Sequence, residues 1–201
     1  MKRILFALGV SAIVASAVQA QELTKEERTK AIEYLEQTEA GVLAATKGLS
    51  EAQWNFKPAP DRWSIAEVSE HIAASEDLIR DNIQTNVMKA PARTEKEDLK
   101  ALDDLVLQRV PDRSVKRQTT EPLRPTNRFG SPKDTLKHFK ASRAKTLAFA
   151  KETKDLRQHA TDSPFGKKLD AYQWVLFLAA HSERHTKQID EVKADPNYPK
   201  K

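Results

Sequence analysis

The sequence predicts an all-α protein built as a four-helix bundle, with an additional short helix in one of its crossings. Four long segments repeat apolar residues at steps of three and four, which is the spacing of one helix face. No segment alternates apolar and polar residues for long, as a half-buried strand would. All ten prolines lie outside the interiors of these segments. Pro132 occupies a helix start, where proline is tolerated. Four amphipathic helices in one domain bury their apolar faces most simply against one another.

Residues 1–20 are expected to be a secretory signal peptide rather than part of the fold. Lys2 and Arg3 give a positive start, residues 4–18 are apolar and small, and Ala20 ends a small-x-small cleavage site. The apolar run is shorter than the ~20 residues of a spanning helix, so we expect no stable membrane insertion, with a signal anchor as the alternative. The predicted product is a secreted, periplasmic protein whose residues 21–201 form a single domain.

Capping residues mark the starts of the expected helices. In a capping box, a Ser or Thr and a Glu three residues later satisfy each other's backbone N–H groups, and this pattern recurs at Thr24, Ser64 and Thr94. Ser131 precedes a proline at the first helical position, and Asp170 forms a related pair with the glutamine three residues later. The expected helices cover roughly residues 24–47, 64–89, 94–109, 132–158 and 170–194, with a single turn at residues 50–53.

Helix ends and crossings are also visible in the sequence. Gly48, Pro91 and the Pro164-Phe165-Gly166 sequence mark helix ends. Two polar crossings connect the expected helices, at residues 48–63 and 110–131. Loops as long as the second crossing are usually functional or mobile. The 110–131 crossing is locally basic but lacks the interleaved aromatic residues of a single-strand binder, so no nucleic acid is expected. A weak contact between this basic crossing and an anionic surface is still compatible with the sequence.

Composition limits the remaining possibilities. The formal net charge is +5, and removal of the signal peptide would lower it by two. Basic and acidic residues are mixed along the helices, as on solvated helix faces. The chain has no cysteine, which excludes disulfides and a lipidated cysteine at the cleavage site. The mature domain must therefore be held together by its core.

Three histidines are the principal candidates for chemistry. His181 and His185 are four residues apart and therefore project from one helix face, in a stripe that also contains Gln188. Buried imidazoles are costly unless they are paired, and a metal is the usual partner of two at once. Hydrogen bonding to neighbours is the alternative interpretation, but His71 also lies on a core-facing edge and favours the metal.

The sequences WSIAEVSEHI at residues 63–72 and WVLFLAAHSERHTKQI at residues 174–189 resemble those of the DinB-like superfamily. The resemblance covers most of the mature chain. It implies a four-helix bundle with one metal on three histidines, one from the second helix and an HxxxH pair from the last, which here are His71, His181 and His185. Members of that family include thiol-dependent transferases and suspected hydrolases. The predicted signal peptide departs from the usual cytoplasmic pattern and argues against a cytosolic thiol as co-substrate.

Three neutral imidazoles bind a divalent transition metal and leave a coordination position for water or substrate. Zinc, nickel, copper and iron all accept imidazole, so the ligands alone do not select the metal and availability outside the cytoplasm decides. We expect one such metal, zinc or nickel. The predicted function is a metal-dependent hydrolase or group transferase that acts on an unknown small-molecule substrate. The alternative is a non-catalytic secreted bundle that binds a metal or a ligand. The sequence leaves a homodimer open.

Other polar residues near the histidines are weaker candidates for a role at the site. Gln188 could hydrogen-bond a ligand histidine or bound water, or serve as a satisfied buried amide. Glu70 points about 100° away from His71 around the helix, so we expect a surface charge rather than a general base. Glu67 is explained by its capping box, and Glu183 is expected to be solvated. The remaining histidines, His138 and His159, lie in charged surroundings and are expected to be exposed and not to bind metal.

The large aromatic residues allow two interpretations. Trp54, Trp63 and Trp174 could line an apolar pocket above the metal, but large aromatic residues at helix starts usually anchor a core. The same two interpretations apply to Phe165 and Tyr172.

Overall fold

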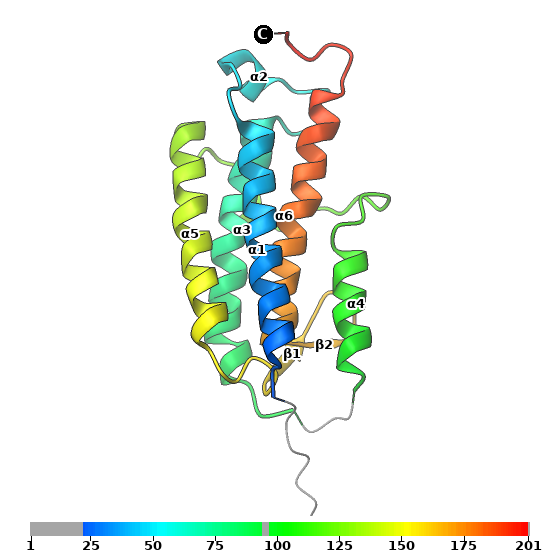
Figure 1. The fold of residues 1–201 in the computed structure, drawn as a ribbon. Coiled ribbons are helices and arrows are strands. Elements are labelled where there is room, and N and C mark those ends of the chain that lie inside the picture. Colours follow the sequence, from blue (N-terminus) through cyan, green and yellow to red (C-terminus); the bar gives the residue numbers. More distant parts are fainter. Residues whose placement is uncertain (1–21, 94–96, 201) are drawn as a thin grey trace, which may run out of the picture.

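The computed structural model describes residues 22–93 and 97–200, so the predicted signal peptide lies outside the described residues. Four long helices form the bundle, which confirms the predicted fold class (Figure 1). They are α1 (Lys25–Thr46), α3 (Ile65–Thr85), α5 (Pro132–Glu152) and α6 (Ala171–Lys193). None of the described helices is long and apolar enough to cross a membrane.

The helices pack in a ring, with α1 beside α5 and α6, and α3 beside the same two helices. In Figure 1, α1 and α6 run upwards whereas α3 and α5 run downwards. Two consecutive bundle helices that run the same way require a long return connection. Here α4 (Leu99–Arg109) rises along the outer side of α6, and the 110–131 crossing then reaches the start of α5.

Most of the predicted capping boxes are present. The side chains of Thr24, Ser64 and Asp170 each accept a hydrogen bond from the backbone N–H of the residue three positions later. The side chain of that later residue accepts in turn from the backbone N–H of the capping residue. Ser50 caps the short helix α2 (Glu51–Asn55) in the same way. The predicted box at residue 94 falls on residues 94–96, outside the described residues. Because Asp98 caps α4 through the N–H of residue 101, the predicted start of this helix was too early.

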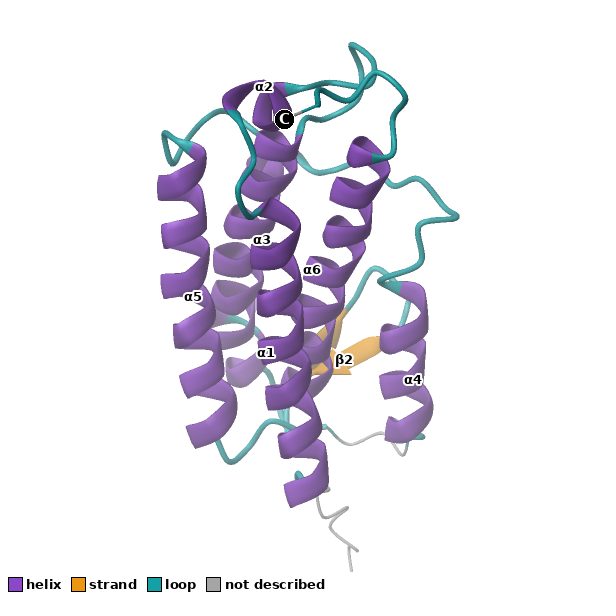
Figure 2. Ribbon diagram, turned by 45° about the horizontal axis from the view of Figure 1, so that its top comes forward, coloured by secondary structure: helices purple, strands orange, loops and turns teal. Residues whose placement is uncertain are grey.

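The connection between α5 and α6 differs from the prediction. Helix α5 ends at Glu152 rather than near residue 158. The chain then turns so that Arg157 reaches the carboxylates of Glu27, Asp103 and Asp170, at 2.6–3.1 Å. A small hairpin follows, with β1 (Ala160–Asp162) antiparallel to β2 (Lys168–Asp170), shown in orange in Figure 2. Short 3-10 helices, η1 (Val87–Lys89) and η2 (Glu121–Leu123), complete the elements.

The core consists of two apolar clusters separated by a polar layer. One cluster contains Ile83 and Leu176, and the other contains Ile72 and Ile189. Between them, fully buried Arg143 of α5 donates two hydrogen bonds to Glu76 of α3, at 2.9 and 2.7 Å. The same guanidinium donates to Leu35 O and Thr38 Oγ1 of α1 and to Ser182 Oγ of α6, so one side chain links all four bundle helices.

Candidate metal centre

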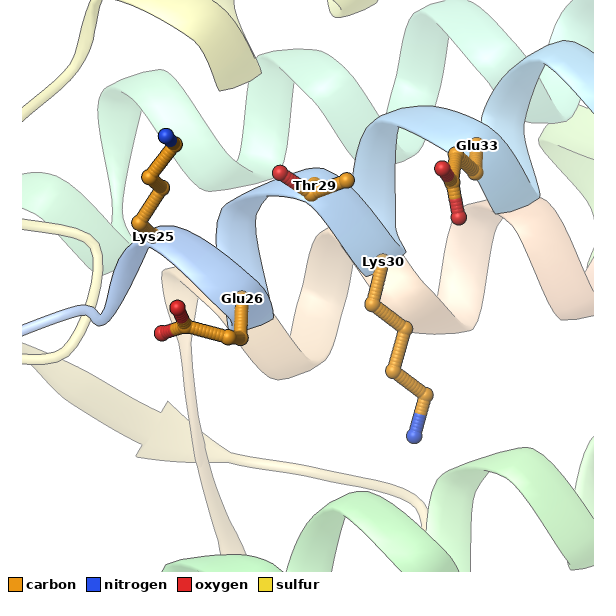
Figure 3. A pocket seen from close by; sticks show the side chains of 5 residues that line it. All are labelled: Lys25, Glu26, Thr29, Lys30 and Glu33. Carbon is orange, nitrogen blue, oxygen red and sulfur yellow. The ribbon is translucent and has the colours of Figure 1, made fainter.

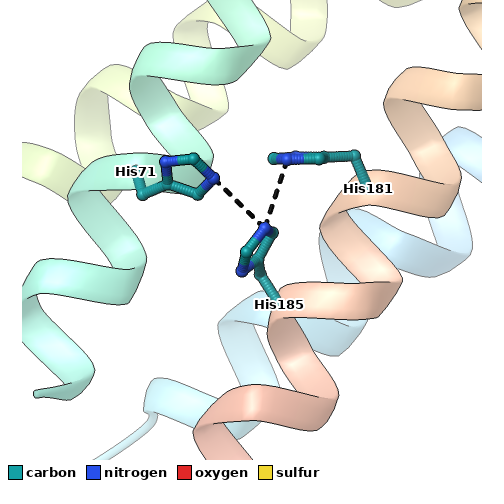
Figure 4. A group of neighbouring side chains, drawn as sticks. All are labelled: His71, His181 and His185. Atoms are coloured by element: carbon teal, nitrogen blue, oxygen red, sulfur yellow. Dashed lines mark hydrogen bonds between the residues drawn. The ribbon is translucent and has the colours of Figure 1, made fainter. Parts of the chain in front are cut away.

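The three predicted histidines lie together between α3 and α6 (Figure 4). Nε2 of His185 is 3.1 Å from Nε2 of His71 and 3.2 Å from Nε2 of His181. His71 and His185 are 3% and 7% exposed, whereas His181 is partly exposed. Among the described residues, these three form the group of histidine and carboxylate side chains whose atoms converge closely enough to hold a metal ion.

Hydrogen bonds on the far side of two rings fix which nitrogen holds the proton. Nδ1 of His71 lies 2.9 Å from the carbonyl oxygen of Leu123, and Nδ1 of His185 lies 2.8 Å from Oε1 of Gln188. The partner of His71 is a carbonyl oxygen and can only accept. The partner of His185 is the oxygen of the Gln188 amide rather than its nitrogen, because Arg113, which can only donate, bonds to the same atom. Each Nδ1 therefore donates, and each Nε2 presents a bare lone pair.

The resulting contact between lone pairs is unfavourable unless a cation lies among them. A metal at 2.0–2.1 Å from two nitrogens in tetrahedral geometry separates those nitrogens by about 3.3 Å. The observed separations of 3.1 and 3.2 Å fit this arrangement. The residues present therefore fit a divalent metal held by three imidazoles.

Electrostatics keep these imidazoles neutral. Burial lowers the pKa of His71, and burial together with the neighbouring imidazoles lowers the pKa values of His181 and His185 well below the usual range. Arg128 and Arg113 add to the effect on His71 and His185, respectively. Because a metal ligand must be unprotonated, these three imidazoles are available as ligands at neutral pH.

Glu70 does not lie on the surface as predicted. It is 6% exposed, and its carboxylate accepts from the backbone N–H groups of Thr126, Asn127 and Arg128 at 2.7–3.2 Å. Asn127 has a φ of 62°, in the left-handed region that Asn tolerates, which lets successive N–H groups face one anion. Burial alone would raise the pKa of this carboxyl, but these hydrogen bonds outweigh burial and lower the pKa. The prediction failed because the 110–131 crossing folds over that side of α3.

The 110–131 crossing is held above the histidines at both ends. Near its start, Arg184 of α6 donates to the carbonyl oxygens of residues 110, 112 and 115. Near its end, His71 and Glu70 of α3 bind residues 123 and 126–128. Arg113 also forms an ion pair with Glu191 at 2.6 Å. These contacts make the crossing one wall of the site.

Replacement of Glu70 by alanine should release the second half of this crossing. The variant leaves several N–H groups without their charged acceptor, which typically costs about 1.5–3 kcal/mol. We expect the free energy of unfolding to fall by that amount and the amides of residues 126–128 to exchange faster with deuterated solvent. Exposed Glu33 on α1 provides the matched control, Glu33→Ala. Unchanged amide exchange in the Glu70 variant would contradict the assigned anchoring.

A cavity of about 990 Å³ opens beside the histidines, and all three line it. Its apolar wall includes Trp63, Phe165 and Phe177, with the Trp63 ring centroid 5.0 Å from that of His71. Trp63 and Phe165 therefore follow the pocket interpretation. Trp54, Trp174 and Tyr172 instead belong to the buried core and follow the anchor interpretation.

Four other polar residues discussed above do not join the triad. His138 bonds to Asp77 at 2.5 Å and His159 bonds to the carbonyl oxygen of residue 90, and both are partly buried rather than exposed. Glu183 is partly exposed and accepts from Tyr34 and Lys187. Glu67 keeps its capping box and lines the cavity while paired with Lys57.

A second cavity, of about 310 Å³, lies on the outer face of α1 (Figure 3). Its lining consists of Thr29 and of two lysine and two glutamate side chains, at residues 25, 26, 30 and 33. The side chains of Lys25 and Lys30 point in different directions. This surface combines no converging polar groups, so the candidate functional site is the histidine cavity.

Comparison with known proteins agrees with this geometry. Residues 34–189 match the family model of the DinB superfamily, which is most of the chain. The chain belongs to the DinB superfamily. A DinB superfamily bundle was expected from the motifs around His71 and His185, and the family match confirms that part of the prediction.

Two similar proteins come from Bacillus subtilis. The uncharacterized protein YuaE of strain 168 is 28% identical over 148 residues, which cover 73% of this chain and 87% of YuaE. The solved structure of YfiT has a TM-score of 0.56 at 15% identity and covers 88% of this chain and 91% of its own. YfiT is described as a probable metal-dependent hydrolase with an unusual four-helix bundle topology. At this identity, the likeness establishes the fold of the present DinB superfamily member.

Residues of the crossing that complete this site were not singled out in the sequence. Leu123 contributes only a backbone carbonyl, for which side-chain patterns give no indication. Arg113 lies in the locally basic crossing, and nothing in its sequence context indicates that it bonds both Gln188 and Glu191. Gln188 itself lies where the helical stripe placed it, one turn beyond His185.

Proposed function

We propose that His71, His181 and His185 bind one divalent transition metal, zinc or nickel, and that the protein is a metal-dependent hydrolase or group transferase acting on a small molecule. The observation that supports this most strongly is the convergence of three imidazole nitrogens at the wall of a large cavity. No fourth histidine, cysteine or carboxylate joins the group within the described residues. Three protein ligands and an accessible side are typical of catalytic metal sites.

The bound metal would supply a Lewis acid that polarises a carbonyl or lowers the pKa of water toward about 7. The chain's own residues orient the site. The carbonyl of Leu123 and the amide of Gln188 hold two rings with Nε2 facing inward. Trp63, Phe165 and Phe177 offer apolar contact to a substrate and exclude water from that side. The likeness to YfiT, described as a probable metal-dependent hydrolase, supports this proposal.

Replacement of Gln188 by alanine tests whether the site is catalytic. Loss of the hydrogen bond to Nδ1 frees the His185 ring, and partners of metal-bound histidines typically contribute about 10–100-fold in affinity or activity. We expect the variant, loaded with excess metal, to retain most of it yet lose activity by that factor in a screen of ester, amide and thiol-transfer substrates. Gln158→Ala, away from the cavity, is the control. Equal activity in the two variants would contradict the assigned role.

The alternative function is a secreted bundle that binds a metal or ligand without catalysis. It would be favoured by a coordination sphere closed with four protein ligands. X-ray absorption spectroscopy of the metal-loaded protein distinguishes the two functions, because an open site contains a water oxygen alongside three imidazole nitrogens.

We also propose that the protein is exported to the periplasm. The charged start, apolar run and small-x-small site of residues 1–20 support this, and helix α1 begins only at Lys25. The exported protein should begin at Gln21, which mass measurement of the periplasmic product would establish. A membrane-bound product that retains residues 1–20 would identify the segment as an anchor instead.

A further inference from the structure

Positive charge is concentrated on the side of the histidine cavity that the crossing forms. Seven arginine and lysine residues line this cavity, against three acidic residues. The whole chain, by contrast, has a formal net charge of only +5 over 201 residues. The cavity is therefore far more positive than the average surface of the molecule.

Four of these basic residues already have partners. Arg62 and Arg113 pair with Glu191, at 3.5 and 2.6 Å. Arg184 is occupied by carbonyl oxygens of the crossing, and Arg124 pairs with Glu121 at 3.1 Å. These four residues hold the wall together and offer little unsatisfied charge to a ligand.

The other three, Arg109, Lys116 and Arg117, are designated here the basic rim. Arg109 is the last residue of α4, and the other two lie in the crossing that follows. Across the described part of the chain, their side chains form no ion pair or hydrogen bond, although all three line the cavity. Two of the three acidic residues in the lining are already paired, Glu67 with Lys57 and Glu191 with Arg113. Asp61 is the remaining acidic side chain of the lining, so the three basic residues of the rim outnumber the carboxylates that could offset them.

Arg109, Arg113, Lys116, Arg117 and Arg184 all line this one cavity. Their like charges repel one another at this separation. An anion bound among these groups would relieve the repulsion, and guanidinium groups bind carboxylate and phosphate oxygens in a matching fork.

We propose that the cavity selects organic oxyanions, with the carboxylate or phosphate group held by the basic rim. The apolar part of such a molecule would lie against Trp63, Phe165 and Phe177, on the wall that adjoins His71 and His181. The inference rests on the proposed function in that it names the substrate class of the same cavity. Binding of the anion itself requires no turnover.

Calorimetry on metal-free protein at pH 8 tests the inference without a contribution from the metal. The probes are phenylphosphonate, benzoate and benzyl alcohol, which share an aromatic ring and differ in charge. We expect affinity to decrease in that order and to weaken with added salt. A triple variant, Arg109→Gln with Lys116→Gln and Arg117→Gln, should lose on the order of tenfold in affinity for both anions.

The matched control removes the same charge elsewhere. Lys137, Lys140 and Lys145 are exposed on α5 and do not line the cavity, and their replacement by glutamine should leave anion affinity unchanged. Benzyl alcohol binding as tightly as the anions, or equal losses in the two triple variants, would overturn the inference.

A second measurement separates this inference from the proposed function. Metal-loaded protein is assayed with 4-nitrophenyl hexanoate and with the mono-4-nitrophenyl ester of adipic acid, which differ by one carboxylate. Preference for the adipate ester in kcat/KM, lost in the rim variant, would support both proposals. Failure to cleave either ester, together with charge-dependent binding in calorimetry, would count against ester hydrolysis alone and leave the anion site standing.

Discussion

A variant in which His181 and His185 are both replaced by alanine is expected to lose nearly all of its bound metal and, with it, any metal-dependent activity. Two of the three converging nitrogens disappear, and the remaining imidazole of His71 is a poor ligand alone. The loss in affinity should exceed the roughly 100-fold typical of removing an outer partner of a metal ligand. Metal analysis after dialysis measures it, and His71→Ala should weaken binding as well.

His138→Ala and His159→Ala are the matched controls, because both histidines lie away from the cavity. Both should retain one metal per chain. Equal metal content in the double variant and in these controls would eliminate the site.

The same site should show a defined pH dependence. Because burial lowers the folded pKa of His71 and lowers those of His181 and His185 further, protons should displace metal only below the ordinary histidine value of about 6.5. In the metal-free protein, unfolded histidines take up protons below about pH 6.5 while the folded ones stay neutral. Their contribution to stability is therefore complete above that pH and falls with acidification, by up to about 1.4 kcal/mol per pH unit for each histidine. Urea denaturation at pH 7.5 and 5.5 measures this.

The second large effect is expected in the polar layer of the core. Glu76→Ala would leave the fully buried Arg143 without its carboxylate and should lower the free energy of unfolding by about 3–5 kcal/mol. Thr146 would lose its bond to the same carboxylate. Urea denaturation monitored by helical circular dichroism gives the change. Asp104→Ala, which breaks a surface pair with Lys100, is the control and should change the free energy of unfolding little.

A double variant, Glu76→Leu with Arg143→Met, distinguishes broken pairing from general disruption. Apolar residues of similar volume often replace a buried ion pair without loss. We expect most of the lost stability to return. A double variant no more stable than Glu76→Ala would mean that the pair is not the source of the effect.

The bundle and its triad were predictable because local patterns determine them. Helix α6 begins with a capping box at Asp170, and steps of three and four then place His181, His185 and Gln188 on one side of it. Arg143 followed a pattern too, since it lies four residues after buried Phe139 and three before buried Thr146. Its charge, among neighbouring lysines, concealed that position.

Features that depend on distant segments were not predictable. The burial of Glu70 exists only because residues 126–128 fold against it, more than fifty positions later in the chain. The hairpin of β1 and β2 has three-residue strands, too short for an alternating pattern to be recognised. The end of α5 was misplaced because Arg157 finds its carboxylates on three other elements.

The uneven attachment of the 110–131 crossing has a consequence for how this fold can diversify. Residues 110–115 and 123–128 are bound to α6 and α3, whereas residues 116–120 line the cavity and, in the described structure, form no hydrogen bond to a bundle helix. Sequence changes or insertions in these five positions can alter what enters the cavity while the three histidines and their orienting bonds stay in place. The segment is therefore the natural position for a library that changes which small molecules the cavity accepts.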